Sequence, residues 1–341
     1  MAKRNLTRIL ALGAALFLAS CRPVGQTPTP TFAPLAVSSP TTEPGLPLCF
    51  SPREILPFAF SPENASLFVR SNSGVQVISL TTGEEEAFIE SPQRLVAATL
   101  SSDGQTLAWN LEDNSTQLIR LSDRVASGTF EGTPDTVFHL RFTQDGASLF
   151  SVSHEGWVRR WGQDGSPQPS LDLGGEVVGM GISADGAKLA VISSDGPVRV
   201  WTLQGTRGVV EFGGTGGTDT SSAEFSPDGQ YLAADLATGL FVWRVSDGTL
   251  VWNEVRNSMA VTYSPDGRVL AYADVDQGNK IFLASPDGSQ VIRELEGMQG
   301  PVWELFFSPD SSVLAATDGA EIRIWQAESG TLLAIGKTAC P

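Results

Sequence analysis

One short turn recurs seven times between residues 61 and 311 of this 341-residue chain. Each copy begins with Ser or Thr, has an acidic third residue and, in most cases, ends in Gly, which tolerates the positive φ of a tight turn. Their starts lie 38 to 44 residues apart. In chain order the copies are Ser61-Pro62-Glu63-Asn64, Ser101-Ser102-Asp103-Gly104, Thr143-Gln144-Asp145-Gly146, Ser183-Ala184-Asp185-Gly186, Ser226-Pro227-Asp228-Gly229, Ser264-Pro265-Asp266-Gly267 and Ser308-Pro309-Asp310-Ser311.

The segments around each turn indicate short β-strands. An apolar strand is expected before every turn, a second strand after it, and two more strands before the next repeat. A unit of this length with four strands is typical of a β-propeller blade. The sequence therefore predicts an all-β fold, a seven-bladed β-propeller over residues 48–341. Its innermost strands are expected at 56–60, 96–100, 137–142, 177–182, 223–225, 260–263 and 302–307.

The second and third strands carry a further repeated pattern. A Leu recurs at one place in every second strand, and the third strand ends in Trp161, Trp201, Trp243 or Trp325 in four of the repeats. Together with the Asp-Gly turn, this pattern resembles the WD-repeat propellers, and the turn also resembles that of Tol-associated bacterial propellers. The resemblance covers about residues 54–336, and the Trp residues are expected to be core aromatics.

The chain departs from the WD pattern in its polar residues. No Trp is followed by Asp, the Gly-His pair is absent, and the only histidines are His139 and His154. The Asp–His–Ser–Trp hydrogen-bond network of that family therefore cannot form. We expect apolar packing between the sheets to stabilise the blades instead.

The N-terminus reads as a bacterial export signal. Lys3, Arg4 and Arg8 precede a short apolar run, and Leu18-Ala19-Ser20-Cys21 resembles the lipoprotein processing box. The resemblance implies a signal peptide at 1–20 and acylation of Cys21, which would anchor the chain in the cell envelope. A plain secretory signal with an accidental Cys is the alternative. Residues 21–47 are rich in Pro, Thr and Ser, which predicts a disordered tether.

Two further cysteines stand near the ends of the predicted ring. Because a propeller is closed, its two ends must meet, and the exported compartment is oxidising. We therefore predict a disulfide between Cys49 and Cys340. Two unpaired thiols are the alternative.

The charge balance limits the class of partner. The formal net charge is −16, and removal of the signal peptide would take three positive charges with it. A field of this sign disfavours nucleic acid and anionic membrane surfaces. It suits a basic partner or a cation, and it also suits a protein that only needs to stay soluble.

An acidic rim is the predicted partner-binding surface. Carboxylates recur in the loops between the second and third strands, and in WD-like propellers those loops share a face with the links between blades. The alternative is that these carboxylates only keep the turns soluble and bind no partner. The rim residues are Glu155, Asp195, Asp235, Asp274, Asp276 and Asp318.

Other motifs give weak signals. Residues 274–279 place oxygen ligands at alternate positions, as a calcium loop does, but their order departs from that motif. The glycine-rich stretch 213–218 lacks the Lys and Ser/Thr of a phosphate loop. Two histidines without a thiolate cluster do not make a zinc site. We expect no catalytic residue, no metal site and no cofactor, although a pair of carboxylates across the central channel stays open.

The sequence thus predicts a non-catalytic, monomeric, envelope-anchored module that binds a protein, peptide or glycan. One alternative is a propeller hydrolase or lactonase with calcium in the channel. Another is a structural subunit of an envelope complex. The identity of the ligand does not follow from the residues, because function depends on the site rather than on the fold.

Overall fold

The computed structural model describes residues 46–49, 56–130, 137–162, 164–194, 196–203, 208–214, 222–255 and 260–337. Within these ranges the regular secondary structure consists of strands β1 to β29. No helix in them is long and apolar enough to cross a membrane. The predicted lipidation site Cys21, the rim residue Asp195 and the predicted disulfide residue Cys340 lie outside the described residues.

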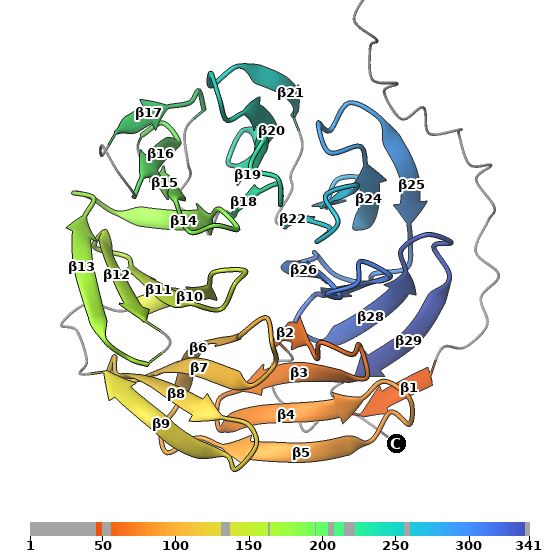
Figure 1. Cartoon of the computed structure of the whole chain (residues 1–341). Helices are drawn as coiled ribbons and strands as arrows, with labels where there is room; N and C mark the ends of the chain where they lie inside the picture. The colour runs from red at the N-terminus through yellow and green to blue at the C-terminus, as the bar shows by residue number, and fades with distance from the viewer. Residues whose placement is uncertain are drawn as a thin grey trace, which may run out of the picture. The chain divides into compact units, whose positions relative to one another are not determined.

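The described strands form seven sheets around a central axis (Figure 1). Six sheets have four strands in chain order, and the seventh has five. Neighbouring strands within each four-stranded unit are antiparallel, as in a meander. The prediction of a seven-bladed all-β propeller is confirmed.

The first four blades run from the N-terminal side in chain order. Blade 1 consists of β2 (Leu56–Phe60), β3 (Ser66–Ser71), β4 (Gly74–Ser79) and β5 (Glu85–Glu90). Blade 2 consists of β6 (Leu95–Leu100), β7 (Thr106–Leu111), β8 (Thr116–Arg120) and β9 (Val125–Phe130). Blade 3 consists of β10 (Val137–Phe142), β11 (Ser148–Ser153), β12 (Trp157–Gly162) and β13 (Pro167–Asp172). Blade 4 consists of β14 (Val177–Ile182), β15 (Lys188–Ser193), β16 (Arg199–Thr202) and β17 (Val209–Glu211).

The last three blades complete the ring. Blade 5 consists of β18 (Ala223–Phe225), β19 (Tyr231–Leu236), β20 (Gly239–Arg244) and β21 (Leu250–Glu254). Blade 6 consists of β22 (Val261–Tyr263), β23 (Leu270–Asp274), β24 (Lys280–Ala284) and β25 (Val291–Leu295). Blade 7 consists of β26 (Glu304–Phe307), β27 (Val313–Thr317), β28 (Glu321–Gln326) and β29 (Leu332–Lys337), with β1 (Leu46–Cys49) added at its outer edge.

The first strand of each blade lies nearest the axis, as the sequence predicted (Figure 1). Four of these strands have the predicted bounds. The others shift slightly, since β6 begins one residue earlier, β22 one residue later and β26 two residues later than expected. The shift in β26 matters for function, because it leaves Trp303 ahead of the strand.

The recurring turn joins the first strand of a blade to the second and is built the same way in blades 2 to 7. The Ser or Thr hydroxyl donates to the Asp Oδ1 over 2.5 to 2.7 Å. The same Oδ1 accepts the backbone amide two residues further on. In all seven copies the fourth residue has a φ of 55° to 71°, the left-handed region that favours glycine. Asn64 and Ser311 adopt it without being glycine.

The recurrent Leu and the residue in the Trp position face each other across two strands in six of the seven blades. All seven Leu side chains are 0% exposed, so each anchors its blade in the core. The observed register therefore explains why both positions repeat. The six pairs are Leu67 with Ile78, Leu107 with Ile119, Leu149 with Trp161, Leu189 with Trp201, Leu232 with Trp243, and Leu314 with Trp325. In blade 6 the register is displaced by one residue, so that Leu270 lies opposite Ala284 and Leu283 lies opposite Ala271.

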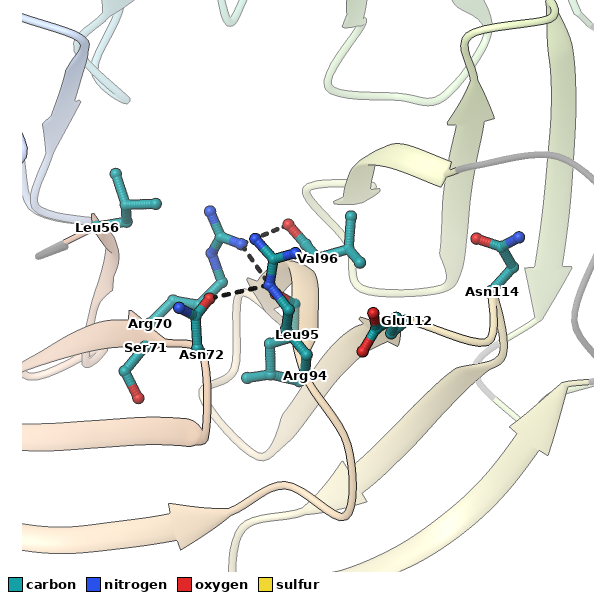
Figure 2. A pocket seen from close by; sticks show the side chains of 9 residues that line it. All are labelled: Leu56, Arg70, Ser71, Asn72, Arg94, Leu95, Val96, Glu112 and Asn114. Atoms are coloured by element: carbon teal, nitrogen blue, oxygen red, sulfur yellow. Dashed lines mark hydrogen bonds between the residues drawn. The ribbon is translucent and has the colours of Figure 1, made fainter. Parts of the chain in front are cut away.

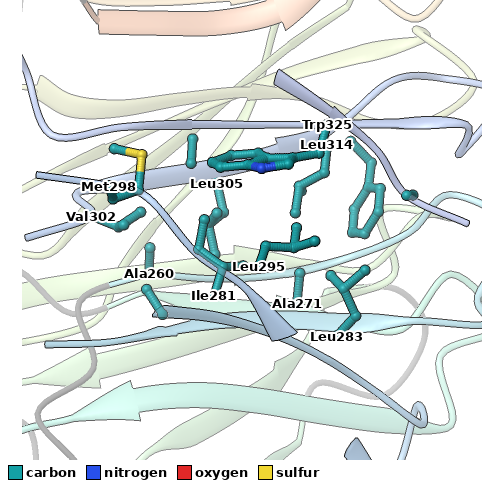
Figure 3. Packing of buried hydrophobic residues seen from close by; sticks show 14 residues of the cluster. Ala260, Ala271, Ile281, Leu283, Leu295, Met298, Val302, Leu305, Leu314 and Trp325 are labelled. Atoms are coloured by element: carbon teal, nitrogen blue, oxygen red, sulfur yellow. The ribbon is translucent and has the colours of Figure 1, made fainter. Parts of the chain in front are cut away.

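Apolar clusters fill the space between adjacent blades. Between blades 6 and 7, Ile281 and Leu283 of one sheet pack with Leu314 and Trp325 of the next, and Met298 from the connecting segment joins them (Figure 3). Trp161, Trp243 and Trp325 are buried, whereas Trp201 is partly exposed. Inter-blade burial at about 25 cal/mol per Å² is the term that holds the sheets together.

Candidate functional site

One edge of the ring, here called the loop face, carries both the turns between second and third strands and the links between blades. Backbone hydrogen bonds join the two sets. The Leu95 amide donates to the Asn72 carbonyl over 3.2 Å, and the Val177 amide donates to the His154 carbonyl over 2.9 Å. The loop face is therefore a continuous, backbone-braced surface rather than a set of independent loops.

The structure corrects the predicted acidic rim. Asp235 is only 3% exposed and Asp274 only 1%, so neither is displayed on the loop face. The prediction failed there because both residues lie at the ends of second strands, where the side chains enter the blade instead of solvent. Glu155 and Asp276 are exposed, and Asp318 is half-buried.

Asp274 and Asp318 use their carboxylates to shape the loop face. Asp274 Oδ1 accepts the backbone amides of Asp276 and Gln277 over 2.9 and 3.3 Å, which closes its own turn. Asp318 Oδ1 likewise accepts the Glu321 amide over 2.8 Å, while its Oδ2 accepts the Gly300 amide over 3.0 Å. Asp318 thus ties a turn of blade 7 to the link that leads into the same blade.

Asp235 is different, because its burial has little compensation. Burial raises the pKa of Asp235 to about 8. Among the described residues its Oδ1 has no hydrogen-bond partner. A carboxyl group in such a place favours its neutral form.

Trp303 is the large aromatic residue that the loop face presents at blade 7. Its side chain is 48% exposed. Its amide donates to the Thr317 carbonyl over 2.8 Å, and a Cβ placed on Gly319 would lie 2.5 Å from its ring. The indole of Trp303 therefore packs on the turn at Gly319, where any side chain would displace it.

Two other apolar side chains are exposed on the same face. Trp157 follows the turn between β11 and β12 and is 37% exposed, and Val255 follows β21 and is 85% exposed. Trp and Arg are the residue types most enriched at the centres of protein interfaces.

A polar cleft of about 390 Å³ lies on the loop face between blades 1 and 2 (Figure 2). Arg70 from the end of β3 and Arg94 from the link into β6 both enter it. Leu56, Leu95 and Val96 form the apolar part of the lining. The sequence did not predict this cleft, because Arg70 and Arg94 belong to two different repeats and the chain as a whole is acidic.

The inner strands hold an ion pair that spans three blades. Arg141 Nη1 of blade 3 lies 2.6 Å from Glu224 Oε1 of blade 5. Between them, at the matching position of blade 4, stands Gly181, where a Cβ would lie 2.3 Å from the Ala223 carbonyl oxygen. Glycine is thus required for close contact of blades 4 and 5. The carboxylate of Glu224 faces a guanidinium, not a second carboxylate.

Two other titratable groups of the inner strands have shifted pKa values. Burial lowers the pKa of His139 to about 4, and Arg141 and His154 act in the same direction. Burial raises the pKa of Glu304 to about 7, with Arg70 opposing the change. Within the described ranges, no group of three or more His, Cys, Asp or Glu side chains is placed to hold a metal ion.

Comparison with known proteins identifies one of the repeats. Residues 289–326 match the WD domain, G-beta repeat. This stretch contains the last strand of blade 6, β25, and the first three strands of blade 7, β26, β27 and β28. The matched WD repeat is therefore offset by one strand from the four-stranded sheet of blade 7. A WD repeat is therefore shown in blade 7 of the seven-bladed propeller.

Curated relatives share similar WD-repeat stretches. WD repeat and SOCS box-containing protein 1 of Danio rerio is 34% identical over 116 residues, 32% of this chain and 27% of that protein. Meiotic recombination protein rec14 of Schizosaccharomyces pombe is 32% identical over 114 residues, 32% of this chain and 37% of that protein. COMPASS component SWD3 of Saccharomyces cerevisiae is 28% identical over 130 residues, 37% of this chain and 40% of that protein. The matched stretch thus spans between about a quarter and two fifths of the length of these relatives.

Proposed function

We propose that this protein is a lipid-anchored, extracytoplasmic scaffold of a bacterial cell envelope that binds a protein partner through its loop face. The WD-type propeller supplies a rigid frame, and the loop face presents the contact side chains. No chemical step is assigned to it, and we propose that it acts as a monomer. One relative, COMPASS component SWD3, is by its name a part of an assembly, which supports a scaffold role.

The exposed Trp303 is the observation that carries this proposal. A Trp that is 48% exposed leaves apolar surface in water. The hydrogen bond from its backbone amide to Thr317 and its packing against Gly319 nevertheless hold Trp303 in place. An anchor ordered before binding loses little conformational entropy when a partner covers it. Val255 on the same face favours a protein over a glycan, since an aliphatic side chain gains more from apolar contact than from sugar hydroxyls.

A photocrosslinking experiment tests the loop face. With p-benzoylphenylalanine in place of Trp303, we expect a discrete crosslinked species in the cell envelope of the source organism. The matched control is the same probe at Val210, which is 50% exposed on the outer strand β17. Once the partner is known, Trp303→Ala should weaken binding by about tenfold to a hundredfold, because interface Trp residues act as hot spots.

The folded state should not change in this test, since the Trp303 side chain is half exposed. The proposal fails if both probe positions give the same species, or if Trp303→Ala binds the crosslinked partner as tightly as the wild type does.

A second experiment tests the anchor. We expect Cys21→Ser to abolish incorporation of labelled fatty acid, because the thiol that would carry the acyl chain is lost. Cys49→Ser is the matched control and should incorporate the label as the wild type does. Labelling of the Cys21→Ser variant would contradict the lipid anchor but not the loop-face scaffold.

A further inference from the structure

The cleft between blades 1 and 2 contains a guanidinium that is oriented by the protein but not neutralised by it. The side chain of Arg94 is exposed, and its Nε donates to Asn72 Oδ1 over 3.3 Å (Figure 2). No carboxylate of the described residues pairs with Arg94. Its two terminal nitrogens are the ones that usually grip a carboxylate in a bidentate manner.

The backbone around Arg94 is fixed from both sides. The Arg94 carbonyl accepts the Glu112 amide over 3.0 Å, and the next amide, that of Leu95, donates to the Asn72 carbonyl. The guanidinium is therefore attached to a braced link and not to a free loop. Binding an anion there would order little more than the side chain itself.

Arg70 adds a second positive charge from the back of the cleft. Its Nη1 donates to the carbonyls of Val96 and Leu95, which holds the guanidinium against the start of β6. Figure 2 shows both arginines entering the cleft. The cleft thus contains two guanidinium groups, of which Arg70 also acts on the Glu304 carboxyl group, so Arg94 is the main anion contact.

The surroundings of the two arginines limit the anion to a single negative charge. Glu112 lines the same cleft, so a second negative charge would be repelled there. The acidic field of the whole chain also opposes polyanions such as nucleic acid. Leu56 and Val96 supply apolar lining on which the neighbours of a carboxylate can pack. A volume of about 390 Å³ has room for one such side chain with part of its flanking residues.

We propose that the cleft between blades 1 and 2 binds one Asp or Glu side chain, flanked by apolar residues, on a loop of a partner protein. The carboxylate lies against the terminal nitrogens of Arg94, with Arg70 behind it. This inference rests on the proposed scaffold function and names a recognition element for it.

Arginine side-chain NMR on the intact folded protein tests this without the partner. The probe is an N-acetylated, C-amidated Val-Asp-Leu tripeptide, whose only charge is the Asp carboxylate. We expect a saturable shift of the Arg94 Nε–H signal with a dissociation constant in the millimolar range. The isosteric Val-Asn-Leu peptide should cause no shift, and the phosphoserine analogue should bind more weakly because of Glu112. An N-acetylated Val-Ala-Leu peptide with a free C-terminus, whose only charge is the terminal carboxylate, separates a terminal carboxylate from a side-chain one.

Variants of the arginine sharpen the test. Arg94→Gln should weaken tripeptide binding at least about tenfold, since a charge-assisted bidentate contact is lost. Arg94→Lys should give an intermediate loss, because the charge remains without the fork. Arg124→Gln is the matched control, for Arg124 is exposed in the turn between β8 and β9 at the opposite edge of the ring.

The inference is overturned if the Asn peptide binds as well as the Asp peptide, if the phosphoserine or the C-terminal carboxylate probe binds best, or if Arg94→Gln binds normally. If a partner crosslinks at Trp303 while the Asp tripeptide does not bind, only this inference fails. If the tripeptide binds but no partner crosslinks, the scaffold function fails and the anion site stands.

Discussion

Asp235→Val is expected to raise the free energy of unfolding by about 3 to 5 kcal/mol at pH 9, since each unit of pKa shift corresponds to about 1.4 kcal/mol. The pKa of Asp235 rises to about 8 because the side chain is buried, so ionisation at high pH opposes folding. The same place, three residues after the recurrent Leu, is apolar in three other blades (Val152, Ile192 and Ala273) and polar in the remaining three (Arg70, Asn110 and Thr317). Three blades thus show that an apolar side chain fits there.

The sign of the pH dependence follows from the direction of the shift. A carboxyl group whose pKa is higher in the folded state binds more protons when folded, so stability falls as pH rises from about 4 to about 8. Glu304, with a pKa of about 7, acts in the same direction. Asp310 acts oppositely. Burial would raise its pKa, yet hydrogen bonds from Ser312, Ser308 and Asn64 hold it at about 2, so its contribution is lost as pH falls towards that value.

The wild-type protein should therefore be most stable near pH 4 to 5, and Asp235→Val should flatten the decline above it. Urea unfolding at a series of pH values measures both. The matched control is Asp276→Val, an exposed carboxylate on the same face, which should change stability by less than about 0.5 kcal/mol. A wild-type stability that stays level between pH 5 and 8, or an Asp235→Val variant that is less stable at pH 9, would contradict the argument.

The fold could be predicted because several local signals repeat in phase. The Ser–Asp turn, the Leu of the second strand and the Trp of the third strand each depend on one blade only. Leu232 and Trp243 illustrate this, since they face each other in a hairpin formed by residues close in sequence. When a local unit is repeated seven times, an error in one copy is corrected by the others.

The site could not be predicted in the same way, because it depends on how blades meet. Asp235 looked like a rim residue, but its burial is set by the packing of neighbouring sheets. Trp303 lies inside the inner strand predicted at 302–307, yet the observed strand begins after it. The Arg94 cleft forms between two blades, so no signal within a single repeat marks it. The only sequence signal for these site residues is that they differ from the residues at the same place in other blades.

Deletion of residues 1–49 is expected to lower the free energy of unfolding by about 2 to 4 kcal/mol relative to deletion of residues 1–45. The two truncations differ only in β1, which pairs in parallel with β29 from Leu46 opposite Ala334 to Cys49 opposite Lys337. Blade 7 thus contains strands from both ends of the propeller, and β1 fastens the ring. Its removal breaks these ladder hydrogen bonds and frees the closing blade. Urea unfolding of the two proteins under reducing conditions measures the difference, and equal stability would contradict a closing role for β1.

The proposed disulfide between Cys49 and Cys340 would reinforce the same closure. Cys49 pairs with Lys337, and Cys340 is the third residue after Lys337 in the sequence. A disulfide needs the two Cα atoms within about 7 Å of each other. In the 46–341 protein under oxidising conditions, Cys340→Ser should then cost on the order of 5 kcal/mol, the upper figure for a cross-link that closes so long a loop. Reduction should remove the difference between the two proteins. Two titratable thiols in the oxidised protein would show instead that β1 pairing alone closes the ring.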